Sequence, residues 1–298
     1  MSIRVVETIA DLRAAVAGAR REGATIGFVP TMGALHAGHA RLVEVAREET
    51  DFVVVSIFVN PTQFGPKEDF SRYPRTLESD LAICGDAGAA LVFTPSVEAI
   101  YPPSPGPRTY VEVPGLSDIL EGASRPGHFR GVATVVMKLF QMVQPDVAFF
   151  GRKDFQQLRV IEKMTSDLDL PVRIRPVATV RESDGLAMSS RNRYLDDAQR
   201  KAATVLSRAL RAAENAVTAG ERDADRVRQI LVETIESESS ALLDYAEVAD
   251  AATLEALARI SPGQPAVALL AARVGPARLI DNAILPEVVE DADQGPQE

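Results

Sequence analysis

The first 176 residues alternate short apolar runs with stretches of helical periodicity, and this alternation restricts the fold more than any other feature. The run Phe52–Val59 is apolar on both faces, as expected for a central parallel strand that helices cover on each side. We therefore expect a doubly wound α/β sheet with helical crossovers. The predicted strands are residues 25–29, 51–59, 90–93, 146–150 and 172–175.

The composition and the order of predicted elements change after about residue 180. Two Ala-rich helical stretches, residues 196–219 and 224–239, precede three strand-like segments, residues 244–248, 266–272 and 278–283. We predict a first domain over residues 1–179, a smaller C-terminal α/β domain over residues 180–286, and a frayed acidic tail over residues 287–298.

Two histidines stand where the first long strand gives way to a predicted helix over residues 41–49. His36 and His39 flank the small pair Ala37-Gly38, and the segment follows an apolar run that ends at Pro30. A helix N-terminus offers unpaired N–H groups and a positive dipole, so a phosphate can bind there. The pattern favours phosphate chemistry, although an HxxH spacing also occurs in zinc sites and in ordinary packing.

The histidine count weighs against those two alternatives. The chain contains three histidines, and the third, His128, lies in another glycine-flanked segment. A zinc hydrolase motif of the HExxH type would need glutamate at position 37, where alanine stands. A zinc hydrolase is therefore disfavoured.

Further polar loops follow predicted strands and could meet the histidines at one edge of the sheet. Loop 151–157 carries Lys153 and Asp154, while loop 60–65 offers amides. Lys153 suits a phosphate, but a solvated surface charge is the alternative; Asp154 fits a ribose contact or a helix N-cap equally well. Loop 60–65 suits hydroxyl or carboxylate recognition, or is simply a turn.

A fourth polar loop, residues 188–193, lies where the two halves join. It contains two serines and two arginines, and arginine offers forked donors that match phosphate oxygens. The loop could cover a triphosphate, or it could be a polar hinge.

Bulk composition limits the partners. The 298 residues carry a net charge of −10 with a pI near 5.0, which argues against nucleic acid or an anionic membrane. The single cysteine, Cys84, is expected to be a buried, inert thiol. No apolar run of about 18 residues and no signal-peptide pattern is present, so we expect a cytoplasmic protein with small-molecule substrates.

Four motifs in order resemble those of the pantothenate synthetase family, the pantoate–β-alanine ligases of the nucleotidylyltransferase superfamily. The match runs essentially from end to end and implies a Rossmann-like doubly wound parallel sheet with a HIGH-type motif. The motifs that carry it are residues 30–39 (PTMGALHAGH), 58–65 (FVNPTQFG), 149–157 (FFGRKDFQQ) and 184–192 (DGLAMSSRN).

The resemblance implies a two-step reaction. Pantoate carboxylate attacks the α-phosphorus of ATP and releases pyrophosphate, and the β-alanine amine then attacks the pantoyl adenylate and releases AMP. It further implies a Mg²⁺ requirement and a homodimer.

It also implies residue roles. His36, His39 and Lys153 would be catalytic and contact the phosphates; Met32, Gln63 and Gln157 would bind pantoate; Asp80 would contact Mg²⁺. His128 and Arg130 would be supporting residues. The implied ATP-binding set is Met32, His36, His39, Gly151, Lys153, Asp154, Val180, Met188, Ser189, Ser190 and Arg191.

Three other functions compete with the ligase. A plain nucleotidylyltransferase usually needs only the first domain and no amine substrate. A tRNA synthetase is disfavoured by the charge of −10 and by the absence of length for an anticodon domain. The third alternative is a catalytically silent nucleotide-binding or oligomerisation protein.

Overall fold

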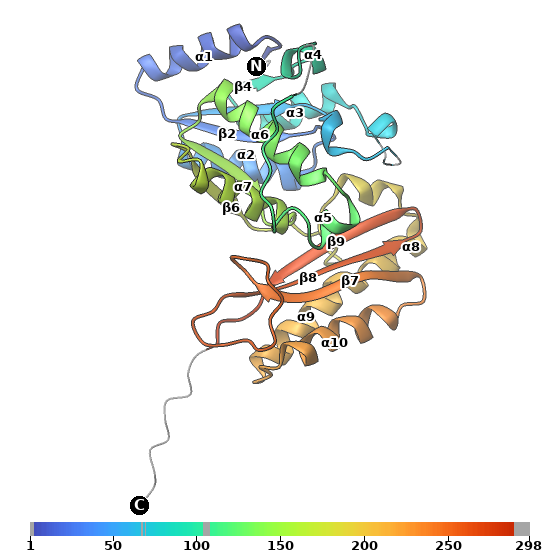
Figure 1. Ribbon diagram of the computed structural model, residues 1–298. Helices are drawn as coiled ribbons and strands as arrows, with labels where there is room; N and C mark the ends of the chain where they lie inside the picture. Colours follow the sequence, from blue (N-terminus) through green and yellow to red (C-terminus); the bar gives the residue numbers. More distant parts are fainter. Residues whose placement is uncertain (1–2, 67, 69, 104–107, 289–298) are drawn as a thin grey trace, which may run out of the picture. The chain divides into compact units, whose positions relative to one another are not determined.

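The computed structural model describes residues 3–66, 68, 70–103 and 108–288, and the chain divides into two compact units (Figure 1). Unit 1 comprises residues 1–180 and unit 2 residues 181–298. Each unit has its own sheet and its own helices, and each is described by itself.

Unit 1 is built on a six-stranded sheet in the order β1-β4-β3-β2-β5-β6, and every neighbouring pair is parallel. The predicted doubly wound α/β sheet is confirmed. The strands are β1 (Arg4–Val6), β2 (Ile26–Thr31), β3 (Phe52–Ile57), β4 (Leu91–Phe93), β5 (Val147–Gly151) and β6 (Arg173–Val177).

Helices cover both faces of this sheet. Buried residues of α2 and α3 share one cluster with side chains of the central strands, while α6 packs against α1 and α7. The helices are α1 (Ile9–Arg21), α2 (Ala37–Glu49), α3 (Leu77–Asp86), α4 (Val97–Ile100), α5 (Glu121–Ser124), α6 (His128–Val143) and α7 (Phe155–Asp167), with short 3₁₀ turns η1 (Pro61–Gln63) and η2 (Phe70–Arg72).

The order of the strands reverses beside β2. The chain runs from β2 to β3 and β4 on one side, then crosses to β5 and β6 on the other, so β2 and β5 are paired neighbours. In open α/β sheets, ligands bind beyond the carboxyl ends of the strands at such a point. A ligand-binding site is therefore expected at the loops that follow β2 and β5.

Unit 2 has a three-stranded antiparallel sheet in the order β7-β8-β9, with α9 and α10 packed against it (Figure 1). Small buried alanines of the helices and strands, among them Ala209, Ala213 and Ala268, form much of its core. The elements are η3 (Ser190–Tyr194), α8 (Asp197–Ala203), α9 (Val205–Thr218), α10 (Ala224–Glu236), β7 (Ala241–Asp250), β8 (Ala266–Val274) and β9 (Ala277–Ile284).

Some predicted bounds differ from the observed ones. The single helix expected over residues 196–219 is two helices, which meet at Thr204, and the hydroxyl of Thr204 donates to the carbonyl of Lys201. The core of unit 2 continues to Val288, two residues beyond the predicted domain end. Residues 289–298 of the predicted tail lie outside the described residues.

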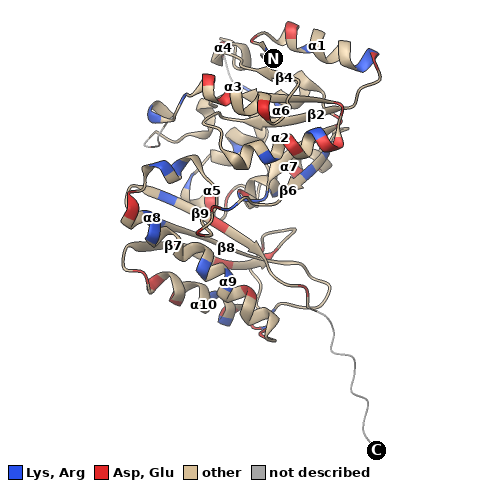
Figure 2. Cartoon of the chain, turned by 180° about the vertical axis from the view of Figure 1, so that it is seen from behind, with Lys and Arg blue, Asp and Glu red and all other residues tan. Residues whose placement is uncertain are grey.

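Acidic and basic residues are interspersed along the surface helices, as the colours of Figure 2 show for α2 and for the helices of unit 2. On α2, Arg41 pairs with both Glu44 and Glu48. Among the described residues, no helix is both long and apolar enough to cross a membrane.

Candidate active site

The histidine pair forms the N-terminus of α2, immediately beyond the carboxyl end of β2. The helix begins at Ala37, four residues earlier than the sequence predicted, and His36 is its N-cap. Nδ1 of His36 accepts from the N–H of Gly38 at 3.1 Å, and Nδ1 of His39 accepts from the N–H of His36 at 3.4 Å. Because both Nδ1 atoms are acceptors, each neutral ring carries its proton on Nε2.

The surroundings of the pair keep His39 uncharged. The two ring centroids are 4.1 Å apart. The pKa of His39 is lowered to about 3, mainly by burial; His36 and Lys153 also lower it, and Asp154 opposes the shift. The ammonium group of Lys153 therefore lies close enough to act on the His39 ring, although the two residues are far apart in sequence.

Lys153 lies in the turn between β5 and α7, next to the loop that carries the histidines. Its Nζ is 3.5 Å from Oδ1 of Asp154, and its side chain is 20% exposed. Asp154 occupies the N-cap position of α7 but makes no capping hydrogen bond with its side chain. The simple N-cap interpretation of Asp154 is therefore not supported, and its carboxylate faces the lysine instead.

A second group of predicted residues gathers after β3. Gln63 is buried in η1; its Nε2 donates to Sδ of Met32 at 3.1 Å, and its Oε1 accepts from Nδ2 of Asn60 at 3.0 Å. Asn60 also donates to the carbonyl of Gly131 at 3.1 Å, which ties η1 to α6. The structure thus brings Met32 and Gln63 together. Gln157 is half-buried in the first turn of α7.

Gln63 also belongs to a hydrogen-bond network with His128, Arg125 and Glu68. His128 lies between the guanidinium of Arg125, at 3.0 Å from Nε2, and the carbonyl of Gln63, at 2.8 Å from Nδ1. Because arginine can only donate, Nε2 is the acceptor and Nδ1–H donates to Gln63. Arg125 also pairs with both carboxylate oxygens of Glu68. The supporting role of His128 stays a prediction, and nothing in the sequence spacing indicates Arg125 or Glu68. Arg130 packs its guanidinium over the ring of Tyr110 instead.

Asp80 differs from its predicted environment. The side chain is 1% exposed, and its oxygens accept from the backbone N–H groups of Ala34 and Leu35. Among the residues that the structure describes, no group of three or more His, Cys, Asp or Glu side chains is placed to hold a metal ion. The contact with Mg²⁺ predicted for Asp80 therefore gains no support from this arrangement.

The loop over residues 188–193, which contains two serines and two arginines, belongs to unit 2. Ser189 caps η3 by accepting from the N–H of Arg191 at 3.3 Å, and Asn192 donates to Glu182 and to the carbonyl of Ala187. Met188 and Ser190 are half-buried, as is Val180 at the end of unit 1.

A bidentate ion pair holds the N-terminal end of the segment that leads into this loop. Arg181 places Nη1 at 2.6 Å and Nη2 at 3.0 Å from the two oxygens of Asp281, which is 3% exposed. This pair joins the first residue of unit 2 to its last strand, β9.

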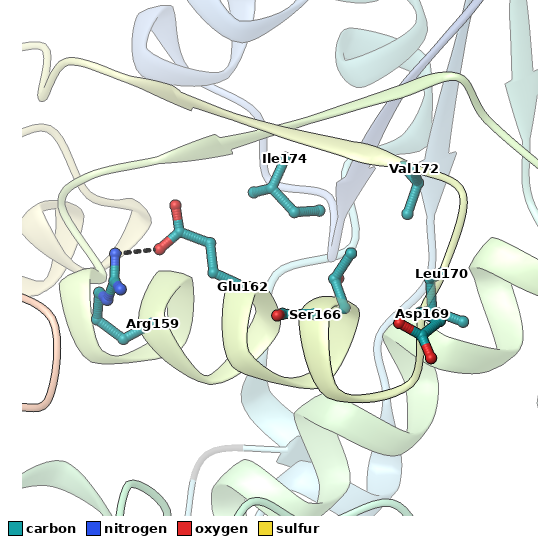
Figure 3. A pocket seen from close by; sticks show the side chains of 8 residues that line it. Arg159, Glu162, Ser166, Asp169, Leu170, Val172 and Ile174 are labelled. Carbon is teal, nitrogen blue, oxygen red and sulfur yellow. Dashed lines mark hydrogen bonds and ion pairs between the residues drawn. The ribbon is translucent and has the colours of Figure 1, made fainter.

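A hollow on the surface of unit 1 lies elsewhere. Figure 3 shows it between the later turns of α7 and strand β6, where Arg159 donates to Glu162. Burial raises the pKa of Glu162. None of the candidate site residues lines this hollow.

His128, which is buried, and His39, which is half-buried, give a testable pH dependence of stability. Burial lowers the pKa of His128 to about 4, with Arg125 as a further cause, and that of His39 to about 3. The unfolded chain therefore binds more protons than the folded one below pH 6.5, and the free energy of unfolding should fall as the pH drops from 6.5 toward 4. We expect His128→Gln to reduce the slope of this free energy against pH by up to about one proton.

Urea unfolding at several pH values between 4.5 and 7 measures that slope, and the glutamine side chain retains an amide that can bond to the carbonyl of Gln63. An unchanged slope in both His128→Gln and His39→Gln would contradict the assignment.

The fold and site together define a class. A parallel sheet, a histidine pair after β2 and a lysine after the neighbouring β5 characterise an α/β nucleotidylyltransferase-type protein. The comparisons with known proteins narrow this class. The profile of the family described as pantoate-beta-alanine ligase matches residues 4–284. The chain therefore belongs to the pantoate–β-alanine ligase family.

Individual relatives agree with this membership. The chain is 54% identical over 284 residues to the pantothenate synthetase of Pelotomaculum thermopropionicum, covering 95% of this chain and 99% of the relative. A crystal structure of pantothenate synthetase from Thermus thermophilus matches with a TM-score of 0.89 at 48% identity, covering 95% of this chain and all of that one. A Francisella tularensis pantoate-beta-alanine ligase complexed with beta-gamma ATP and beta-alanine matches with a TM-score of 0.77 at 33% identity, covering 95% and 97%.

Proposed function

We propose that this chain condenses pantoate with β-alanine through a pantoyl adenylate, with cleavage of ATP to AMP and pyrophosphate. Family membership over residues 4–284 supports the overall reaction. The single structural observation that carries the proposal is the convergence of Lys153 with the His36–His39 pair beyond the carboxyl ends of β2 and β5.

In the first step a carboxylate oxygen of pantoate attacks the α-phosphorus, and the bond from that phosphorus to the bridging oxygen breaks to release pyrophosphate. Negative charge increases on the phosphate oxygens as the bond breaks. The Nε2–H groups of His36 and His39 and the ammonium of Lys153 supply donors and positive charge for these oxygens. Because His39 stays neutral, its Nε2–H remains a donor throughout the physiological pH range.

In the second step the amine of β-alanine attacks the acyl carbon of the adenylate, and AMP leaves. The amine loses a proton, which we assign to water, because the histidines at the site already have their Nδ1 lone pairs bonded to backbone N–H groups.

Pantoate recognition falls to the residues around η1 and the start of α7. Gln63, held against Met32 and Asn60, has an amide for the pantoate hydroxyls or carboxylate, and Gln157 supplies a second amide. For ATP we assign the ribose to Asp154 and the phosphates to the loop of Ser189, Ser190 and Arg191. Gly151, Val180 and Met188 complete the nucleotide contacts.

The remaining parts of the proposal concern the surroundings of the reaction. ATP enters as its magnesium complex, in which phosphate oxygens and water hold the ion. The protein acts in the cytoplasm as a homodimer on small molecules, without a nucleic-acid or membrane partner. The net charge of −10 supports the last of these points, because a chain of this sign repels nucleic acid and anionic lipid.

Amine dependence tests the function. With pantoate and magnesium–ATP, we expect rapid AMP formation when β-alanine is present and little turnover when it is left out. Labelled pyrophosphate should exchange into ATP when pantoate is present without β-alanine, because the first step is reversible. Release of pyrophosphate without AMP, at a rate that does not depend on β-alanine, would favour a plain nucleotidylyltransferase. No reaction under any condition would favour a silent binding protein.

A further inference from the structure

The carboxylate of Asp80 is bonded entirely to the loop that leads into the histidine helix and to its own helix N-terminus. Asp80 lies in the first turn of α3 and is 1% exposed. Its Oδ2 accepts from the N–H of Ala34 at 3.0 Å, and its Oδ1 accepts from the N–H of Leu35 at 2.8 Å. Oδ1 also accepts from the hydroxyl of Thr76 at 3.1 Å. Both oxygens are therefore committed to partners within the protein.

The loop needs such a partner because its backbone is strained. Gly33 has φ +81° and Ala34 has φ +52°, so two successive residues occupy the left-handed region. This conformation is unfavourable for alanine, and it turns consecutive N–H groups toward one side, where they form a nest for an anion. The carboxylate of Asp80 is the anion in this nest. A Cβ on Gly33 would stand 3.0 Å from Oδ2, so the contact is also close.

The end of the loop determines where the histidines lie. Leu35 is followed directly by His36, whose ring caps α2 and whose N–H is bonded to the ring of His39. A shift of the backbone at residues 34 and 35 therefore moves the N-cap and both rings.

The same contacts do not fit a metal ligand. A cation would have to reach a side chain that is 1% exposed and whose oxygens already accept from two backbone N–H groups and one hydroxyl. Among the described residues, no cluster of three acidic, histidine or cysteine side chains surrounds it.

We infer that Asp80 is a positioning residue for adenylation, whose carboxylate fixes the backbone of residues 33–35 and thereby the His36–His39 pair. This inference rests on the proposed function for its effect on the rate. Its effect on the geometry of the histidines is independent of that function.

Asp80→Asn is the informative change. The amide keeps the size of the side chain but has one acceptor oxygen, so its NH₂ group must face a backbone donor. We expect the kcat of pantoate-dependent pyrophosphate exchange to fall about 100-fold, as for other misplacements of a catalytic group by about 1 Å. The kcat/KM for β-alanine in the full reaction should stay unchanged, because β-alanine reacts only after adenylation.

Two further measurements separate positioning from other roles. If Asp80 held magnesium, raising the Mg²⁺ concentration would restore the variant; we expect no restoration. The chain has three histidines, so ¹⁵N-histidine NMR resolves them. Asp80→Asn should move the ring signals of His36 and His39 away from the Nε2–H pattern and leave those of His128 in place.

Matched controls complete the design. Glu78→Gln removes an exposed carboxylate from the same turn of α3 and should match wild type in rate and spectrum. Thr76→Val removes one donor to Asp80 and should move the same two histidine signals by less, which keeps the test decisive if Asp80→Asn does not fold.

A wild-type kcat in Asp80→Asn, recovery at high Mg²⁺, or unmoved His36 and His39 signals in the folded variants would each overturn the inference. Failure of the proposed function would look different, since the wild-type enzyme itself would then form no AMP.

Discussion

Lys153→Met should reduce the rate of adenylation about 100-fold or more while leaving the protein folded. Methionine is an unbranched side chain one atom shorter than lysine, and it removes the charge that acts on His39 and, as we propose, on the phosphates of ATP. One pre-organised charged donor at developing negative charge contributes roughly 3 kcal/mol, which corresponds to a factor of this size. Pyrophosphate exchange in the presence of pantoate measures the step directly.

The matched control for this change lies on the following helix, α7. Lys163 pairs with Asp167 in an i,i+4 arrangement and is 55% exposed, so Lys163→Met removes an equal charge far from the carboxyl ends of the strands. We expect it to retain the wild-type rate. Comparable rates for the two variants would refute the assignment of Lys153 to the phosphates.

Gly131→Ala should damage both the stability of unit 1 and its use of pantoate. A Cβ at this position on α6 would lie 2.4 Å from the carbonyl oxygen of Thr62 and 2.7 Å from Cα of Gln63. These are backbone atoms, so η1 must move away, and the bond from Asn60 to the carbonyl of Gly131 is strained or lost. Overpacking of this kind costs about 1–3 kcal/mol.

The displacement carries Gln63 with it, so the KM for pantoate should rise about tenfold or more, in line with the loss of a well-placed hydrogen bond to substrate. The KM for ATP should change much less.

Gly18→Ala is the control for the glycine substitution itself. Gly18 lies within α1, and the nearest atom to an added Cβ there is Nη2 of Arg21 at 3.9 Å. Alanine should therefore leave pantoate use unchanged and raise the stability by up to about 1 kcal/mol through its helix propensity. Thermal unfolding and initial rates on both variants test the pair. If Gly131→Ala behaved like Gly18→Ala, the close approach of α6 to η1 would be disproved.

Local patterns allowed the parallel sheet to be predicted, because each long strand carries its own apolar signal. Strands β2, β3 and β5 lie within two residues of the predicted positions, whereas the three-residue edge strand β1 is too short to show a pattern. In unit 2 the strand positions were also predicted, but their antiparallel order was not, since periodicity does not encode strand direction.

The candidate site also contains residues that local sequence patterns indicate and residues that they do not. His36, His39 and Lys153 could be selected as candidates because each lies in a polar loop or helix start directly after a strong strand. The partners that hold them in place could not. Asp80 reaches Ala34 across 46 residues, and Arg125 reaches Glu68 across 57, and no spacing rule joins such pairs. The roles assigned to Gln157, Val180, Met188, Ser189, Ser190 and Arg191 stay predictions.

The bidentate ion pair between Arg181 and Asp281 has a consequence for the synthesis of the protein on the ribosome. Synthesis runs from the N-terminus, so the segments of unit 1 leave the ribosome long before β9 exists. The segment that begins at Arg181 and carries Ser189 and Arg191 acquires this anchor only after Asp281, 100 residues further along the chain, has been synthesised. A nascent or C-terminally truncated chain that lacks Asp281 thus has its histidine and lysine loops but lacks the ion pair that ties the serine–arginine segment to β9. A prematurely terminated product is therefore not a fully assembled enzyme.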